Sequence, residues 1–250
     1  MKTLTAIIGA DAGCGSTMCA ETAAELIGKN ASVLLISASG KFGDDYIQNK
    51  EGCSLDDLKA ALLSGSLEEK EFLRSLVREK GIMILPSVRD PSDADRYTGE
   101  AMNCLLQAAD RYEYVILDLG ERMDSPFLLR GAEAADRRYF VLTQQAKTLR
   151  RFRERKEKIL DPLSINGRIV INKYRRSSIL PSAKEIESEF GMPVCGTIPW
   201  LDSGWQAEAE RSILFRDGRA LRTMENIAHE ITGKMKVRKT WKKNWMFRKV

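Results

Sequence analysis

With 250 residues, the chain is long enough for one large domain or two small ones. It is 43% hydrophobic and 30% charged, which is typical of a globular protein in water. No apolar run approaches the roughly 18–20 residues that span a membrane. The apolar run at 6–8 is also shorter than the about 7–15 residues of a signal-peptide core, so we expect a cytoplasmic protein.

The net charge of +5 is unevenly distributed. Residues 234–250 contain eight basic side chains and no acidic one, which leaves 32 basic and 35 acidic residues in 1–233. The body is therefore slightly acidic and the excess positive charge lies in a tail. This pattern argues against a domain that is basic throughout, as many nucleic-acid-binding domains are.

The five cysteines are scattered, and none belongs to a CxxC pair. With a single histidine, His229, the chain lacks the usual ligand pattern of a zinc site. We expect free thiols in a reducing compartment.

Short apolar, β-branched runs alternate with segments of helical spacing along the chain. In chain order, strands are predicted at 5–8, 33–36, 82–85, 115–117, 139–142, 169–171 and 194–198. Helical segments are predicted at 17–27, 55–63, 67–77, 99–109, 126–134, 148–159, 183–190 and 217–231. The charged stretch 150–158 mixes signs, so we interpret it as a solvated helix face with i,i+4 ion pairs.

This alternation predicts an α/β fold. We expect a single doubly wound, mostly parallel sheet of about seven strands flanked by helices, in one domain over 1–233. Residues 234–250 follow it as a basic tail. In such sheets ligands bind at the carboxyl ends of the strands, so the loops after Ile8, Ile36, Leu117 and Ile171 are the places to look for a site.

The first of these loops is rich in glycine and precedes a predicted helix. Glycines let backbone N–H groups turn toward an anion, and the helix N-terminus favours negative charge. A working phosphate loop also needs a lysine before the Ser/Thr, and Ser16 stands there. Taken alone, the loop is explained equally well as a structural turn.

The order of motifs resembles the MinD/ParA family of P-loop ATPases. The loop 9–17 resembles its deviant Walker A motif, KGGxGKT, with Asp11 in place of the first lysine and Ser16 in place of the second. Later matches to the family's strand-end motifs are, in order, 33–39 ("VLLIDxD", with Ser37 and Ser39 replacing both aspartates), 84–86 ("LP"), 112–120 ("YDYIIIDTPPG"), 141–145 ("VTQP"), 171–173 ("VNR") and 196–200 ("GxIPxD").

The resemblance implies a nucleotide site for ATP or ADP with Mg²⁺. Its phosphate loop comprises Asp11, Ala12, Gly13, Cys14, Gly15, Ser16 and Thr17. Thr17 and Asp118 would bind the magnesium, and Asn172, Ile198 and Pro199 would contact adenine. The alternatives are an empty site, with Asp118 as a strand-end turn residue and Asn172 as an ordinary loop residue.

The substitutions in these motifs predict that ATP hydrolysis is inefficient or lost, so we expect no catalytic residues. The family uses the two lysines on phosphate, one of them across a dimer, and the second aspartate of its DxD to orient water. Losing one transition-state donor costs about 10²- to 10³-fold in rate. A carboxylate at Asp11 is expected to repel phosphate as well.

Degenerate motifs of this kind resemble the CpaE/TadZ branch, which implies a localisation or scaffold role in pilus or secretion machinery, with a protein partner and a homodimer. An active partitioning or division-site ATPase remains the alternative, with a lysine such as Lys41 acting in trans.

The tail combines tryptophan with lysine and arginine. If it is helical, Val237, Trp241 and Trp245 lie on one line, with Phe247 beside it. This composition is typical of helices that lie on a membrane, so we expect binding to anionic lipid at the inner face. Docking on a protein partner or non-specific nucleic-acid binding are the alternatives.

Overall fold

The computed structural model describes residues 2–40, 54–202 and 217–233. The tail residues Val237, Trp241, Trp245 and Phe247 lie outside this part of the chain, as does Lys41. The predictions that rest on them therefore stay predictions.

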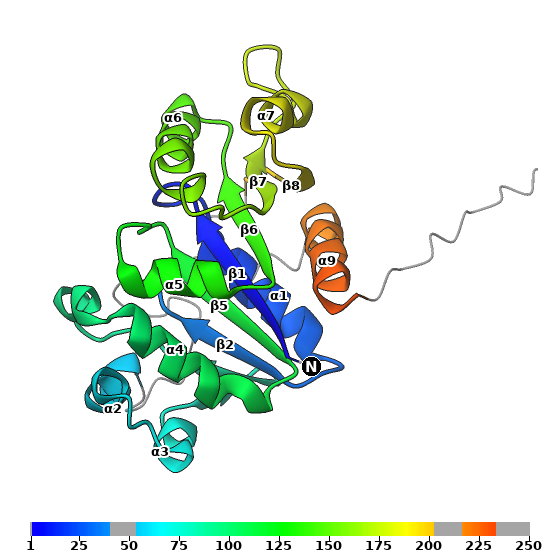
Figure 1. The fold of residues 1–250 in the computed structure, drawn as a ribbon. Coiled ribbons are helices and arrows are strands. Elements are labelled where there is room, and N and C mark those ends of the chain that lie inside the picture. The colour runs from blue at the N-terminus through cyan, green and yellow to red at the C-terminus, as the bar shows by residue number, and fades with distance from the viewer. Residues whose placement is uncertain (1, 41–53, 203–216, 234–250) are drawn as a thin grey trace, which may run out of the picture.

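The described residues form one sheet of eight strands in the order β3-β4-β2-β5-β1-β6-β7-β8 (Figure 1). The strands are β1 (Thr3–Gly9), β2 (Val33–Ser37), β3 (Val77–Glu79), β4 (Ile82–Leu85), β5 (Tyr114–Gly120), β6 (Arg137–Leu142), β7 (Arg168–Tyr174) and β8 (Val194–Pro199). Every pairing is parallel except β3 with β4. The predicted parallel α/β sheet is confirmed, with one more strand than the seven expected.

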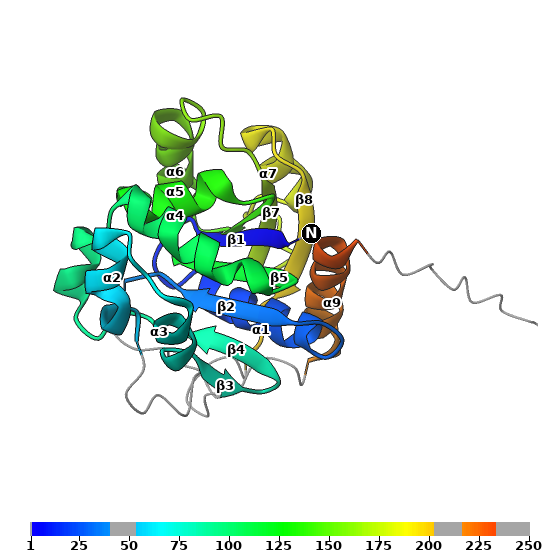
Figure 2. The same ribbon diagram turned by 60° about the horizontal axis from the view of Figure 1, so that its bottom comes forward.

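Helices cover both faces of the sheet (Figures 1 and 2). They are α1 (Ser16–Gly28), α2 (Lys59–Ser64), α3 (Glu69–Arg74), α4 (Gly99–Ala108), α5 (Pro126–Ala134), α6 (Ala146–Arg155), α7 (Ala183–Phe190) and α9 (Gly218–Thr232). α1 and α9 pack together on one face, and α4, α5 and α6 lie on the other. Because both faces are covered, β2 and β5 are buried along their whole length. Among the described helices, none is both long and apolar enough to cross a membrane.

The additional strand replaces the end of a predicted helix. The pattern predicts a helix over 67–77, but α3 stops at Arg74, where the Ser75 hydroxyl donates to the Phe72 carbonyl at 2.7 Å. Lys80 and Gly81 then both take positive φ, as a tight two-residue hairpin turn requires, and β3 folds back on β4.

Two other predicted helices cover their expected ranges but are not α-helical throughout. The segment 55–63 begins as a 3₁₀ turn, Leu55–Leu58, before α2, and the helix over 148–159 ends in a π-helical turn, Lys156–Leu160. Short 3₁₀ turns also occur at Pro91–Arg96 and Ala109–Arg111.

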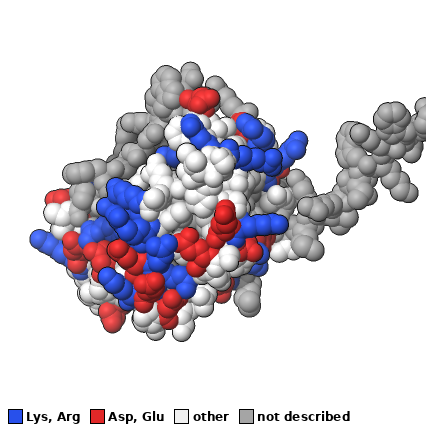
Figure 3. Space-filling view, turned by 90° about the horizontal axis from the view of Figure 1, so that it is seen from above, with Lys and Arg blue, Asp and Glu red and all other residues white. Residues whose placement is uncertain are grey.

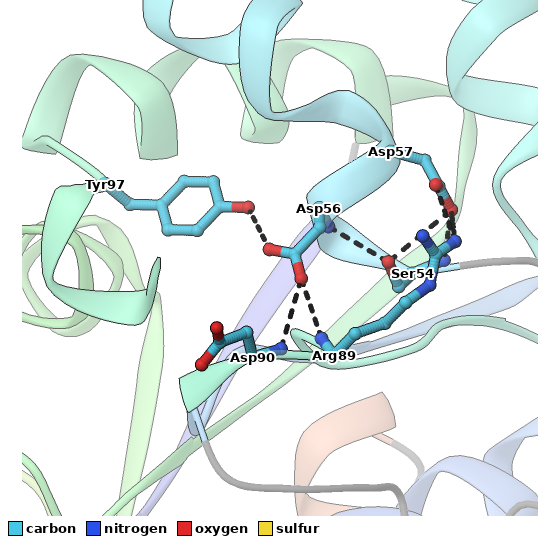
Figure 4. Close-up of polar contacts among 6 residues, drawn as sticks. All are labelled: Ser54, Asp56, Asp57, Arg89, Asp90 and Tyr97. Atoms are coloured by element: carbon cyan, nitrogen blue, oxygen red, sulfur yellow. Dashed lines mark hydrogen bonds and ion pairs between the residues drawn. The ribbon is translucent and has the colours of Figure 1, made fainter. Parts of the chain in front are cut away.

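A polar cluster fixes the chain beyond the carboxyl end of β4 (Figure 4). The Asp56 carboxylate accepts from the Tyr97 hydroxyl at 2.9 Å and from the Arg89 N–H at 2.7 Å. The Arg89 guanidinium donates to both oxygens of Asp57 at 2.6 Å. Since these groups bind one another, we interpret the cluster as structural: it joins the 3₁₀ turn Leu55–Leu58 to the loop that follows β4.

Candidate functional site: the edge at the carboxyl ends of the strands

The parallel strands bring the predicted site residues to one edge of the sheet. Asp118 lies near the end of β5, in register with Ile7 of β1 on one side and with Ser37 of β2 on the other. The N–H of Ala10 donates to the Val141 carbonyl at 2.9 Å, so the loop after β1 also joins the end of β6. The loop after β1 and Asp118 therefore lie together at the carboxyl edge of the sheet.

The loop between β1 and α1 has the backbone shape of a phosphate loop. Gly13 and Gly15 have φ of 73° and 85°, in the left-handed region, and Gly15 caps α1. Within the described residues, no acceptor is found for the N–H groups of Gly15, Ser16 and Thr17. Open N–H groups at a helix N-terminus can bind an anion.

The two positions that the family fills with lysine have different surroundings. The Ser16 side chain is buried, with its hydroxyl against Gly9 of β1: a Cβ on Gly9 would lie 3.1 Å from Ser16 Oγ. Asp11 is buried too, at 6% exposure, and its Oδ1 accepts from the Ala12 N–H at 2.9 Å.

Two cations of α6 neutralise Asp11. Arg151 forms an ion pair and hydrogen bond with Asp11 Oδ1, and Lys147 Nζ lies 3.8 Å from Oδ2. Burial by itself would raise the pKa of Asp11, but the hydrogen bonds from Arg151 and Ala12 and the charges of Arg151 and Lys147 lower it overall. The repulsion expected from this carboxylate is therefore offset, because its charge is paired within the chain.

A cavity of about 360 Å³ adjoins Asp11 on its α6 side. The loop after β1, the turn after β5 and α6 line it, and among its lining residues Arg155 donates to the Ala10 carbonyl at 2.7 Å. Figure 3 looks onto this end of the molecule, with Lys and Arg side chains interleaved with Asp and Glu. The loop is thus bordered by a cavity whose lining carries both acidic and basic side chains.

Asn172 and Lys173, at the end of β7, contact the loop from the other side. The Asn172 amide donates to the Cys14 carbonyl at 2.8 Å, and its oxygen accepts from the Lys173 N–H at 2.8 Å. Lys173 Nζ donates to the Gly13 carbonyl at 3.0 Å. Asn172 thus lies beside the loop, and its amide is bound to the loop itself; its predicted contact with adenine stays a prediction.

The predicted adenine side is formed by β7 and β8. Pro199 pairs with Tyr174, and the Arg175 guanidinium lies 4.3 Å from the centre of the Trp200 ring. Ile198 is 1% exposed, so its side chain belongs to the core rather than to a base-binding surface. Pro199 is half-buried and Trp200 is exposed, so their side chains form part of the surface of this edge.

The residues predicted to hold magnesium also lie at this edge. Thr17 is half-buried in the first turn of α1, and Asp118 is buried, with Oδ1 accepting from the Gly120 N–H at 3.1 Å. A hydroxyl and a carboxylate suit the preference of Mg²⁺ for oxygen when phosphate supplies further ligands. In the described ranges, no group of three His, Cys, Asp or Glu side chains could hold a metal by itself.

The sequence alone predicts no role for the basic groups around the loop. The stretch 150–158 is mostly exposed, as predicted for a solvated face. The predicted i,i+4 pairs are not found among the ion pairs of the described residues: Arg151 binds Asp11, Arg153 pairs with Glu189 of α7, and Arg155 donates to the Ala10 carbonyl. The sequence did offer a sign of these contacts: α6 directly follows β6, whose end lies at the site, and its first turns contain several cations.

The sheet order and the glycine loop define the class: the chain has the fold of the ParA/MinD P-loop ATPases. No protein-family model matches the chain. Cobyric acid synthase from Photorhabdus laumondii is 26% identical over 201 residues, which are 76% of this chain and 32% of that protein. The chain therefore spans about a third of the curated relative's length.

Three solved structures carry the comparison of the fold. A ParA family ATPase from Chlorobium tepidum has a TM-score of 0.76 and 21% identity, over 91% of this chain and 99% of that one. MinD from Pyrococcus horikoshii complexed with Mg-ADP has a TM-score of 0.75 and 13% identity, over 92% and 96%. The MinC:MinD complex from Aquifex aeolicus has a TM-score of 0.74 and 17% identity, over 93% and 97%.

Replacing Asp11 with asparagine tests the ion pair with α6. Because the pKa of Asp11 is lowered, its stabilising effect is present above the ordinary value of 3.8 and is lost as the pH falls through the folded value. We expect Asp11→Asn to lower the free energy of unfolding by about 1–2 kcal/mol at pH 7, less than for a fully buried pair because Arg151 is partly exposed. Urea unfolding at pH 7, 5, 4 and 3 measures this.

The difference between wild type and Asp11→Asn should shrink below about pH 4. Asp124→Asn is the matched control: Asp124 borders the same cavity but is exposed, so its replacement should change stability little. Equal stability of wild type and Asp11→Asn at pH 7 would contradict the role of the pair.

Alanine substitutions at Gly15 and Gly13 provide a second test with a matched control. Both have left-handed φ, which costs an alanine about 1–2 kcal/mol. A Cβ on Gly15 would also lie 2.4 Å from Asn172 Nδ2, whereas one on Gly13 meets nothing within 4 Å. We therefore expect Gly15→Ala to lower the unfolding free energy more than Gly13→Ala, and Asn172→Ala to remove that excess in the double variant. Equal losses in the two glycine variants would contradict the close contact.

Proposed function

We propose that this chain is a ParA/MinD-fold protein that binds ATP or ADP with Mg²⁺, does not hydrolyse ATP efficiently, and acts as a positioning or scaffold factor. One observation carries the proposal: the loop keeps the backbone of a phosphate site but has lost both lysines. Among the described residues, the N–H groups of Gly15, Ser16 and Thr17 find no acceptor, whereas Ser16 and Asp11 occupy the lysine positions.

Nucleotide binding is supported by the surroundings of the loop. Thr17 and Asp118 would hold the magnesium, and the Pro199–Trp200 edge would contact the base. The fold is shared with a MinD solved with Mg-ADP, so a site of this form is compatible with a nucleotide. Losing one charge-assisted phosphate contact weakens binding by roughly 1.5–3 kcal/mol but leaves the N–H groups in place.

Three features oppose turnover. Ser16 has no charge to stabilise the transferring phosphoryl group, and Ser39 cannot orient a water as a carboxylate does. Asp11 is bound by Arg151, so it is held within its own chain instead of reaching a partner's nucleotide. Each lost donor lowers the rate by about 10²- to 10³-fold.

The basic tail 234–250 supports a role at the cytoplasmic face of the membrane. Its eight cations would attract anionic lipid and its tryptophans would lie at the interface. The resemblance to the CpaE/TadZ branch makes pilus or secretion machinery the assembly that we propose it positions. A relative in the comparison is solved as a MinC:MinD complex, which makes a protein partner a reasonable expectation here, together with a homodimer.

Nucleotide binding without turnover is tested by calorimetry and by phosphate release. We expect the wild type to bind Mg-ATP and Mg-ADP while releasing phosphate at the background rate. Ser16→Lys should bind about 10- to 100-fold more tightly, because it restores a charged contact. Asp118→Asn should weaken the magnesium-dependent part of binding, and Asp124→Asn should not.

Two results would overturn this proposal. Phosphate release that disappears in Asp118→Ala would favour the active ATPase. No binding of Mg-ATP or Mg-ADP by the wild type would mean a site that takes no nucleotide.

The membrane role is tested by co-sedimentation with liposomes. The full chain should sediment with vesicles that contain anionic lipid and remain in solution with zwitterionic ones, since each cation near the surface contributes on the order of 1 kcal/mol. Deleting 234–250 should abolish sedimentation, and Trp241→Ala with Trp245→Ala should weaken it. Liposome binding that survives the deletion would exclude the tail as the anchor. Salt-sensitive DNA binding that survives the tryptophan changes would favour nucleic acid.

A further inference from the structure

Lys173 is placed at the phosphate loop by an unusual backbone conformation. Its φ is 55°, in the left-handed region, which a residue other than glycine adopts only where its surroundings hold it there. The Asn172 side chain supplies that hold, because it binds the Lys173 N–H at 2.8 Å and the Cys14 carbonyl at 2.8 Å. The Lys173 ammonium then lies 3.0 Å from the Gly13 carbonyl oxygen.

Lys173 and Arg155 both bind neutral backbone carbonyls of the loop, unlike two other cations beside it. Arg151 and Lys147 face the Asp11 carboxylate. Lys173 is exposed and binds a neutral carbonyl, and no described carboxylate lies within ion-pair distance of its ammonium. A full positive charge therefore stands at the mouth of a loop whose own lysine position holds Ser16.

We propose that Lys173 is the phosphate-contacting cation of this site and supplies, from the end of β7, the charge that the loop lacks at Ser16. This inference rests on the proposed function and makes it more specific: the ligand is a nucleoside di- or triphosphate, favoured over a monophosphate by its outer phosphates. The unbranched lysine stem lets the ammonium exchange the Gly13 carbonyl for a phosphate oxygen, and the charged hydrogen bond is the stronger one.

The left-handed backbone of Lys173 gives the proposal a second readout. Glycine adopts this conformation without penalty, so Lys173→Gly should unfold at the same temperature as the wild type or higher. If Lys173 served only to stabilise the fold, its replacement would lower the unfolding temperature. Stability and ligand affinity should therefore change in different directions at this position.

The test compares Lys173→Met, Lys173→Arg and Lys173→Gly in the full chain by calorimetry with ATP, ADP, AMP and tripolyphosphate, each with Mg²⁺. Lys173→Met should lose about 10- to 100-fold in affinity for ATP, ADP and tripolyphosphate and little for AMP, and Lys173→Arg should retain most of the affinity. Lys184→Met, an exposed lysine on α7, is the matched control and should behave as the wild type.

The possible failures can be told apart. If the wild type binds ATP and Lys173→Met binds it equally well, the role of Lys173 is overturned and the proposed function stands. If the wild type binds no nucleotide but binds tripolyphosphate through Lys173, the proposed function fails and the cation site stands. If nothing binds to the wild type, both are overturned.

Discussion

The parallel direction of β1, β2, β5, β6 and β7 is the constraint on which the candidate site depends. Residues from distant parts of the sequence are neighbours only because five strands end at one edge. Ile7, Ser37 and Asp118 share a level of the sheet through two parallel registers. The loop after β1 is then enclosed by α6 on one side and by the end of β7 on the other.

Much of this arrangement could be predicted from the sequence. Alternating apolar runs and helices identify a parallel sheet, and the rule that ligands bind at strand ends selects the loops at 9–17, 118 and 172. The hairpin of β3 and β4 was missed because a Ser75 hydroxyl bond and the turn at Lys80 and Gly81 override a helical pattern. The spacing of apolar residues alone does not show that a side-chain hydrogen bond and a turn will end the helix.

The partners of the loop could not be predicted in the same way. That Arg151 binds Asp11 depends on how α6 packs against the edge of the sheet, and these residues are 140 positions apart in the chain. The direction of the Lys173 side chain depends on its positive φ, which no sequence pattern predicts. Composition shows that α6 is basic, whereas only three-dimensional packing shows which of its cations turn inward.

Because Gly15 lies so close to Asn172, the presence of this glycine is not by itself evidence that the loop binds a nucleotide. Any side chain at position 15 would collide with the amide that ties β7 to the loop, with or without a ligand. A lineage that stopped binding nucleotides would therefore still be selected to keep this glycine, as long as Asn172 stayed in place. In such a loop the glycine indicates how the chain packs, whereas the charged residues around it indicate which ligand the loop can bind.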